Sequence, residues 1–327
     1  MAAPRPRDVA VVCGQAWWCD EPHDSKLTEG RLAHLAAIAL VAGSSLLALV
    51  RLSASPHGFA RTPADVAASS FPGVLLWFRC GCLILSVGTV AFKWRNKAMD
   101  ICEWETLDGR QVTFICRGLW RFQGLTSWTW LTIVSYFSVT TLLSIYVVVL
   151  APGAPQHLSP SGAAVAAQLL QEVVTPCSFL VSCIVTYVLI PAKLKERRPV
   201  DEFFYVDVLL MHNANLAMLV PELLLNRMHI ELAHMPVAIL FACVYILWHQ
   251  TVRYERTHTM MYSFLSWKSE HRFKIIAALA SVFAAFYLFA FVVCEYLRPS
   301  TYGPPLVVAV AVSLMQIRQP HENRTTD

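Results

Sequence analysis

Long apolar segments recur along the whole chain, and they restrict its fold more than any other feature of the sequence. The hydrocarbon core of a bilayer is about 30 Å thick, so a helix needs about 20 apolar residues to cross it. Inside lipid only helices and closed barrels satisfy every backbone polar group, and apolar runs of this length favour helices. The segments cover residues 32–50, 74–92, 127–150, 164–190, 203–225, 235–252 and 275–296.

The composition agrees with seven transmembrane helices in one polytopic domain. Apolar residues make up 56% of the 327 residues and charged residues only 15%, whereas soluble domains carry about a quarter charged residues. We therefore expect an all-α transmembrane bundle at 32–297, between a tail at 1–31 and a second tail at 298–327. The apolar segment 305–315 is a candidate for a short eighth span. At 11 residues it is too short to span unaided, which leaves a re-entrant or an interfacial placement as the alternatives.

Lysine and arginine are unevenly distributed between the connections, which predicts the orientation in the membrane. Fifteen of them lie after the second, fourth and sixth apolar segments, and three lie in the alternate connections. This pattern places the N-terminal tail in the cytosol, in the plasma membrane or the endoplasmic reticulum. Since membrane topology accounts for the basic residues, the net charge of +4 requires no nucleic-acid partner. We expect the first apolar segment to be a signal anchor.

The ten cysteines predict neither disulfides nor a metal site. Cys13 and Cys19 lie in the predicted cytosolic tail, where thiols stay reduced. Cys80 and Cys82 lie two residues apart on a transmembrane segment, so their side chains point to different sides. Structural zinc requires four converging ligands, which this spacing does not supply. We expect the thiols to pack as small apolar residues, and we expect no cofactor.

The fifth apolar segment is the least apolar of the seven and carries the candidate chemistry. At about 100° per residue, one stripe of the helix contains Tyr205, His212, Asn215, Leu219 and Glu222. Ionisable groups at membrane depth are costly and usually face the interior of a bundle. The stripe is therefore either a proton-transfer or ligand-binding wall, or a set of hydrogen bonds that hold helices together. Imidazole titrates near neutral pH, which favours function for His212, whereas Glu222 lies near the outer end, where water can solvate it.

Thr126 and Trp248 lie at the predicted cytosolic boundary. Thr126 precedes the third apolar segment, and a hydroxyl becomes a nucleophile when a base such as histidine takes its proton. Threonine in a membrane helix more commonly bonds to its own backbone one turn back. Trp248 and His249 end the sixth segment, where aromatic side chains typically act as interfacial anchors.

Three blocks of residues, taken in order, resemble the androgen-induced/FAR-17a family of membrane hydrolases and the related rolling-stone membrane proteins. The first block is Trp120-Arg121 followed by Leu125-Thr126 at a helix start, and the second is Met211-His212 followed by Glu222. The third block is Tyr245-Ile246-Leu247-Trp248 followed by Tyr262-Ser263-Phe264-Leu265. The resemblance covers about residues 117–297, and its specificity comes from the joint order of short motifs.

The resemblance to the androgen-induced branch implies a membrane hydrolase that acts on fatty-acid esters of hydroxy fatty acids. Under it, Thr126 is the nucleophile and His212 is its base, and the expected partners are membrane lipids and a lipid-ester substrate. Membership of the rolling-stone branch, which the spacing His212-x-x-Asn215 favours, implies instead a non-enzymatic membrane organiser in cell fusion or adhesion. The residues expected to line a binding site are Tyr205, Asn215, Glu222 and Trp248.

Overall fold

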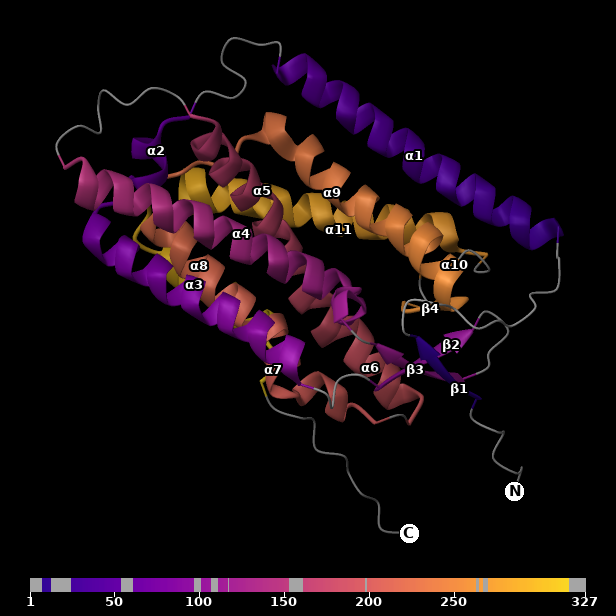
Figure 1. Cartoon of the computed structure of the whole chain (residues 1–327). Coiled ribbons are helices and arrows are strands. Elements are labelled where there is room, and N and C mark those ends of the chain that lie inside the picture. The colour runs from indigo at the N-terminus through magenta and orange to yellow at the C-terminus, as the bar shows by residue number, and fades with distance from the viewer. Residues whose placement is uncertain are drawn as a thin grey trace. The chain divides into compact units, whose positions relative to one another are not determined.

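The computed structural model describes residues 8–12, 25–53, 61–96, 101–106, 111–116, 118–152, 161–197, 199–262, 265–266 and 270–317. Within these ranges seven helical runs are long and apolar enough to cross a membrane (Figure 1). The chain is therefore a multi-pass membrane protein, and the predicted all-α class of its membrane-spanning part is confirmed. The runs are Gly30–Leu52, Pro72–Arg95, Leu125–Leu150, Gly162–Lys195, Val206–Leu225, Leu232–Thr257 and Arg272–Leu297.

The chain divides into two compact units, each assembled from segments that are distant in the sequence. Unit 1 comprises residues 1–59, 90–128 and 233–284. Unit 2 comprises residues 60–89, 129–232 and 285–327.

In unit 1, helix α1 (Ser25–Ser53) packs along α9 (Met235–Trp248). Near its start, Arg31 donates to the backbone oxygen of Gln250 at 3.0 Å and pairs with Glu255 on α10 (Tyr254–Thr257). Much of the remaining surface of α1 is apolar and exposed, with Leu40 75% exposed. An exposed apolar face suits a helix that is surrounded by lipid.

Unit 1 also contains a four-stranded sheet that we did not expect. Strands β2 and β3 pair antiparallel, and β1 joins β3 in parallel. The sequence carries Asp108-Gly109 between β2 and β3, which is a strong hairpin signal. The sheet follows the order β1-β3-β2-β4, with β1 at Asp8–Val12, β2 at Ile101–Thr106, β3 at Gln111–Cys116 and β4 at Thr259–Met260.

Unit 2 is built around α5 (Gly162–Ile184), whose side chains from Val173 to Ser182 are all buried. A helix that is buried on every side lies in the centre of a bundle. It packs against α2 (Pro63–Ala67), α8 (Asn215–Leu225) and a C-terminal helix, α12 (Gly303–Leu314). Further α-helices within the described residues are α3 (Pro72–Arg95), α4 (Leu125–Ile145), α6 (Ile190–Lys195), α7 (Val206–Leu209) and α11 (Arg272–Val292).

Several of the membrane-spanning runs contain a π-helical turn. Such a turn makes hydrogen bonds from each residue to the fifth residue before it, so it rotates the following side chains away from the α-helical register. Residues 203–225 include such a turn, so side chains before and after it do not lie on one face, as a constant 100° per residue would place them. The π turns are Tyr146–Leu150, Val185–Leu189, Leu210–Ala214, His249–Arg253 and Val293–Leu297.

The short apolar segment near the C-terminus forms α12, which lies against α5 and α8 of unit 2. At its C-terminal end, Thr186 Oγ1 donates to the carbonyl oxygen of Leu314 at 2.7 Å, and the Tyr187 hydroxyl donates to that of Ser313 at 2.6 Å. These side chains replace the water that would otherwise satisfy the last carbonyls of a helix.

Seven cysteines are free thiols, and five of them are buried, as expected for small apolar side chains. The seven are Cys80, Cys82, Cys116, Cys177, Cys183, Cys243 and Cys294. Cys13 and Cys19 lie outside the described residues.

Candidate functional site

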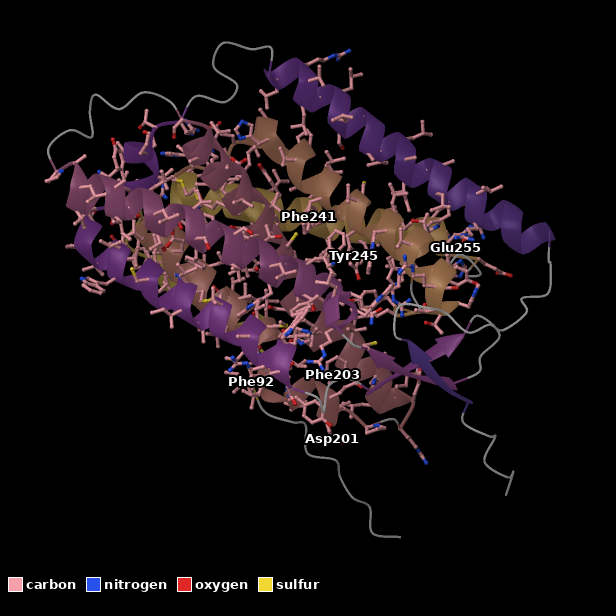
Figure 2. All side chains as sticks on the ribbon, viewed as in Figure 1. Phe92, Asp201, Phe203, Phe241, Tyr245 and Glu255 are labelled. Atoms are coloured by element: carbon pink, nitrogen blue, oxygen red, sulfur yellow. The ribbon has the colours of Figure 1, made fainter. Side chains whose placement is uncertain are left out.

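His212 lies on the π turn Leu210–Ala214, between α7 and α8 of unit 2. The turn is held by α5, because Ser182 Oγ donates to the carbonyl oxygen of His212 at 2.6 Å. The imidazole is partly exposed, and its ring centroid lies 6.3 Å from that of Phe203 (labelled in Figure 2). π turns are rare and frequently occur at functional sites.

Two asparagines tie the same turn to its surroundings. Asn215 is buried, donates to the carbonyl oxygen of Ser178 at 3.4 Å and accepts from Ser182 Oγ at 3.3 Å. The amide nitrogen of Asn213 donates to the carbonyl oxygen of Gln316 at 3.2 Å, and its Oδ1 accepts from the Gln316 backbone nitrogen at 3.0 Å. Asn215 therefore contributes the interhelical hydrogen bonds that we considered for the stripe.

Glu222 forms a fully buried ion pair with Arg79 of α3, within unit 2. Its Oε1 lies 2.6 Å from Arg79 Nη2 and 2.9 Å from Nε, and both side chains are 0% exposed. The Tyr136 hydroxyl and the Asn226 amide donate to the same oxygen at 2.8 and 3.0 Å. The expectation that water solvates Glu222 is wrong, because an arginine from another transmembrane segment supplies its counter-charge inside the bundle.

Arg79 is the residue that sequence reasoning missed at this cluster. Its Nη1 donates to the carbonyl oxygen of Val66 at 2.9 Å and to Ser144 Oγ at 2.7 Å. A charge within the apolar segment 74–92 was the available signal, since such a charge almost always faces a partner inside the bundle. Four donors converge on Oε1 of Glu222, whereas Oε2 has no hydrogen-bond partner in the part of the chain that the structure describes.

Tyr205 does not join this interior. It precedes the first turn of α7 with an extended backbone (φ −63°, ψ 144°), and its side chain is 49% exposed. The prediction that it shares a buried stripe with His212 is wrong for two reasons. Tyr205 lies outside the helix, and a π turn separates it from the residues with which it was aligned.

Asp207 is a second residue that the stripe did not reveal. It lies in α7, five residues before His212, and its side chain is fully buried. Neither of its carboxylate oxygens has a hydrogen-bond partner within the described ranges. A buried carboxylate without hydrogen-bond donors is energetically costly.

Thr126 lies in the first turn of α4 and belongs to unit 1, whereas His212 belongs to unit 2. The residues on either side of Thr126 are fixed within unit 1. The backbone nitrogen of Leu125 donates to the Tyr262 hydroxyl at 3.3 Å, and Lys93 Nζ donates to Ser127 Oγ at 3.1 Å.

Trp248 belongs to an aromatic cluster of unit 1. Its ring centroid lies 5.2 Å from that of Trp128 and 6.4 Å from that of Trp120. The next residue, His249, is 0% exposed, so the expectation that it anchors the helix at the membrane surface is wrong. It lies in a π turn, which carries its ring into the interior of unit 1.

Tyr245, His249 and Arg253 form a buried polar face on the helical run that contains α9 (Tyr245 is labelled in Figure 2). Arg253 donates through Nε to Gln123 Oε1 at 2.9 Å and through Nη1 to the carbonyl oxygen of Thr259 at 2.5 Å. The His249 ring stacks on Tyr262 at 5.9 Å between centroids. Burial raises the pKa of Tyr262, so its phenol is neutral at physiological pH. Neither ring nitrogen of His249 has a hydrogen-bond partner among the described residues.

The residues that the structure describes contain no group of three or more His, Cys, Asp or Glu side chains arranged to hold a metal ion. Comparison with family models, with curated proteins and with solved structures found no match for this chain.

Proposed function

We propose that this multi-pass membrane protein hydrolyses a lipid ester, with Thr126 as the nucleophile and His212 as the general base. The joint order of the blocks around Thr126, His212 and Trp248 supports the proposal. The observation that carries it is the partly exposed imidazole of His212 on a π turn whose backbone is held by Ser182. A catalytic base must keep its position while remaining accessible to the substrate.

The reaction requires two steps. In the first, His212 takes the hydroxyl proton of Thr126 while the threonine oxygen attacks the ester carbonyl carbon. The ester C–O bond breaks, and the alcohol leaves with the proton from the imidazolium. In the second step, water gives a proton to His212 and attacks the acyl-threonine. The bond to Thr126 then breaks, the threonine oxygen recovers the proton, and the carboxylic acid is released.

A second function, a non-enzymatic membrane organiser in cell fusion or adhesion, is favoured by the hydrogen bonds of Asn215. This residue is engaged with Ser178 and Ser182 of a neighbouring helix, which is a structural role. The two functions differ in whether the purified protein has turnover.

The test measures hydrolysis of a fatty-acid ester of a hydroxy fatty acid by the purified protein, with the released acid quantified by mass spectrometry. Because two residues that act as one unit are strongly non-additive, Thr126→Ala, His212→Ala and the double variant should fall to nearly the same low rate. Thr141→Ala, which removes a different hydroxyl of α4, is the matched control and should retain the wild-type rate. Full turnover in Thr126→Ala, or none in the wild type, contradicts the proposal and favours the organiser.

A further inference from the structure

A short turn at Gly118–Phe122 belongs to unit 1, and the proposed hydrolysis does not use it. The turn contacts the end of α3, where the rings of Phe122 and Trp94 stack with 6.1 Å between their centroids. Arg121 Nη1 also donates to the carbonyl oxygen of Lys93 at 3.1 Å. These contacts fix the turn beside the last residues of a membrane-spanning run.

Arg256, near the end of another membrane-spanning run of unit 1, contacts the same turn. Its guanidinium carbon lies 5.4 Å from the centroid of the Trp120 ring, within the range of a cation–π interaction. The Arg256 side chain is exposed, and none of its N–H donors has a hydrogen bond or an ion pair among the described residues. The acidic residue beside it, Glu255, pairs with Arg31 instead. The positive charge of Arg256 is therefore held in position and is not paired with a carboxylate of the described chain.

Two further groups on this surface have the same chemical character. The indole N–H of Trp120 has no hydrogen-bond partner among the described residues. Arg95, the last residue of α3, is exposed and likewise makes no ion pair within the described chain. Exposed guanidinium groups with a neighbouring N–H donor bind the oxygens of an anion through charge-assisted hydrogen bonds. The surface therefore suits a negatively charged group that is rich in oxygen.

The position of the two arginines indicates where that anion comes from. Arg95 ends its membrane-spanning run and Arg256 lies one residue before the end of another, which is the depth of lipid headgroups. Apolar side chains beside them are open to the bilayer. Val252, one turn before Arg256 on the same run, is 43% exposed, and Leu119 of the turn is 81% exposed. An anion at this depth, next to exposed apolar surface, is the headgroup of a lipid whose acyl chains extend along that surface.

We propose that Arg256 and Trp120 bind the headgroup of an anionic phospholipid, and that Arg95 adds to the positive potential at the same place. The distribution of lysine and arginine predicts that this end of the bundle faces the cytosol, and the cytosolic leaflet is the one that carries anionic phospholipids. The site includes neither Thr126 nor His212, so it stands or fails independently of the proposed hydrolysis.

The test measures lipid binding to the purified full-length protein by native mass spectrometry, with phosphatidylserine and phosphatidylcholine titrated separately. The two lipids share a phosphodiester and differ in net charge, so phosphatidylserine should bind about fivefold more tightly or better. Glycerophosphoserine, which is the headgroup without acyl chains, should not compete even in large excess. Thr126→Ala should bind phosphatidylserine with wild-type affinity, which separates this site from the hydrolytic one.

Arg256→Gln is the decisive variant, because it removes the charge of an exposed side chain and should melt at the wild-type temperature. One basic residue at a membrane surface contributes about 1 kcal/mol, so the variant should bind phosphatidylserine about fivefold more weakly and phosphatidylcholine unchanged. Trp120→Leu, which keeps an apolar side chain and removes the ring and its N–H, should also weaken phosphatidylserine binding. Arg51→Gln is the matched control, at an exposed arginine of α1 that has no ring contact among the described residues, and should bind like the wild type.

Three results would overturn the proposal. Equal affinity for the two lipids would remove the charge selectivity. Wild-type affinity in Arg256→Gln, or the same loss in Arg51→Gln, would remove the site from this surface. Competition by glycerophosphoserine would show a site for a soluble phosphate compound and not for a lipid.

Discussion

The buried Arg79–Glu222 ion pair should stabilise unit 2. Replacing Glu222 should lower the free energy of unfolding by more than replacing Arg79. Glu222→Leu leaves the Arg79 guanidinium without a counter-charge, although it is 0% exposed and cannot lose its proton. Removing one partner of a buried pair costs about 3–5 kcal/mol, and we expect this variant to reach that range. Arg79→Leu should cost less, about 1–3 kcal/mol, because the remaining carboxylate still accepts from Tyr136 and Asn226 and can take up a proton.

The double variant Arg79→Leu/Glu222→Leu removes both charges, so its cost should be at least about 2 kcal/mol less than the sum of the single costs. Tyr136→Phe, which removes one neutral donor from the same oxygen, is the control and should cost about 0.6 kcal/mol. The assay is reversible unfolding in mixed micelles by titration with sodium dodecyl sulfate, followed by tryptophan fluorescence. If the cost of the double variant equals the sum of the two single costs within about 0.5 kcal/mol, the reasoning is refuted, because independent sites are additive in this way.

Three further predictions concern the C-terminal helix and the orientation. Gly303→Ala should lower the melting temperature measurably, because the added Cβ would lie 1.8 Å from the carbonyl oxygen of Leu297, and a circular-dichroism melt measures this. Asn213→Leu should speed backbone hydrogen exchange at the end of α12, since it removes both hydrogen bonds to Gln316. A glycosylation sequon inserted at 153–156 should be modified in cells and one inserted at 267–269 should not, and the reverse pattern contradicts a cytosolic N-terminus.

The membrane-spanning segments could be predicted from the sequence because length and apolarity are local properties. Each of the seven expected segments coincides with a helical run of the structure. The face that each residue presents could not be predicted, because the π turns at His249 and before Asn215 change the helical register without a sequence signal that we recognise. Tyr205 was misplaced because it lies outside the helix and because a π turn follows it.

The buried polar clusters were only partly accessible from the sequence. Glu222 was identified as a candidate, but its environment depends on Arg79, which lies 143 residues earlier in the chain. Pairing of this kind is a property of helix packing, which periodicity along one segment does not contain. The complementary charges of Arg79 and Glu222, each within an apolar segment, are the signal that would have predicted their contact.

The central claim, that Thr126 is a nucleophile activated by His212, is tested most directly by covalent labelling. The purified protein is treated with a fluorophosphonate, which transfers its phosphonyl group to an activated hydroxyl and releases fluoride. Peptide mass spectrometry then locates the adduct. We predict an adduct on Thr126 in the wild type and none in His212→Ala, with Thr141→Ala labelled like the wild type. An unlabelled Thr126 in the wild type, or equal labelling of Thr126 in His212→Ala, would contradict the claim.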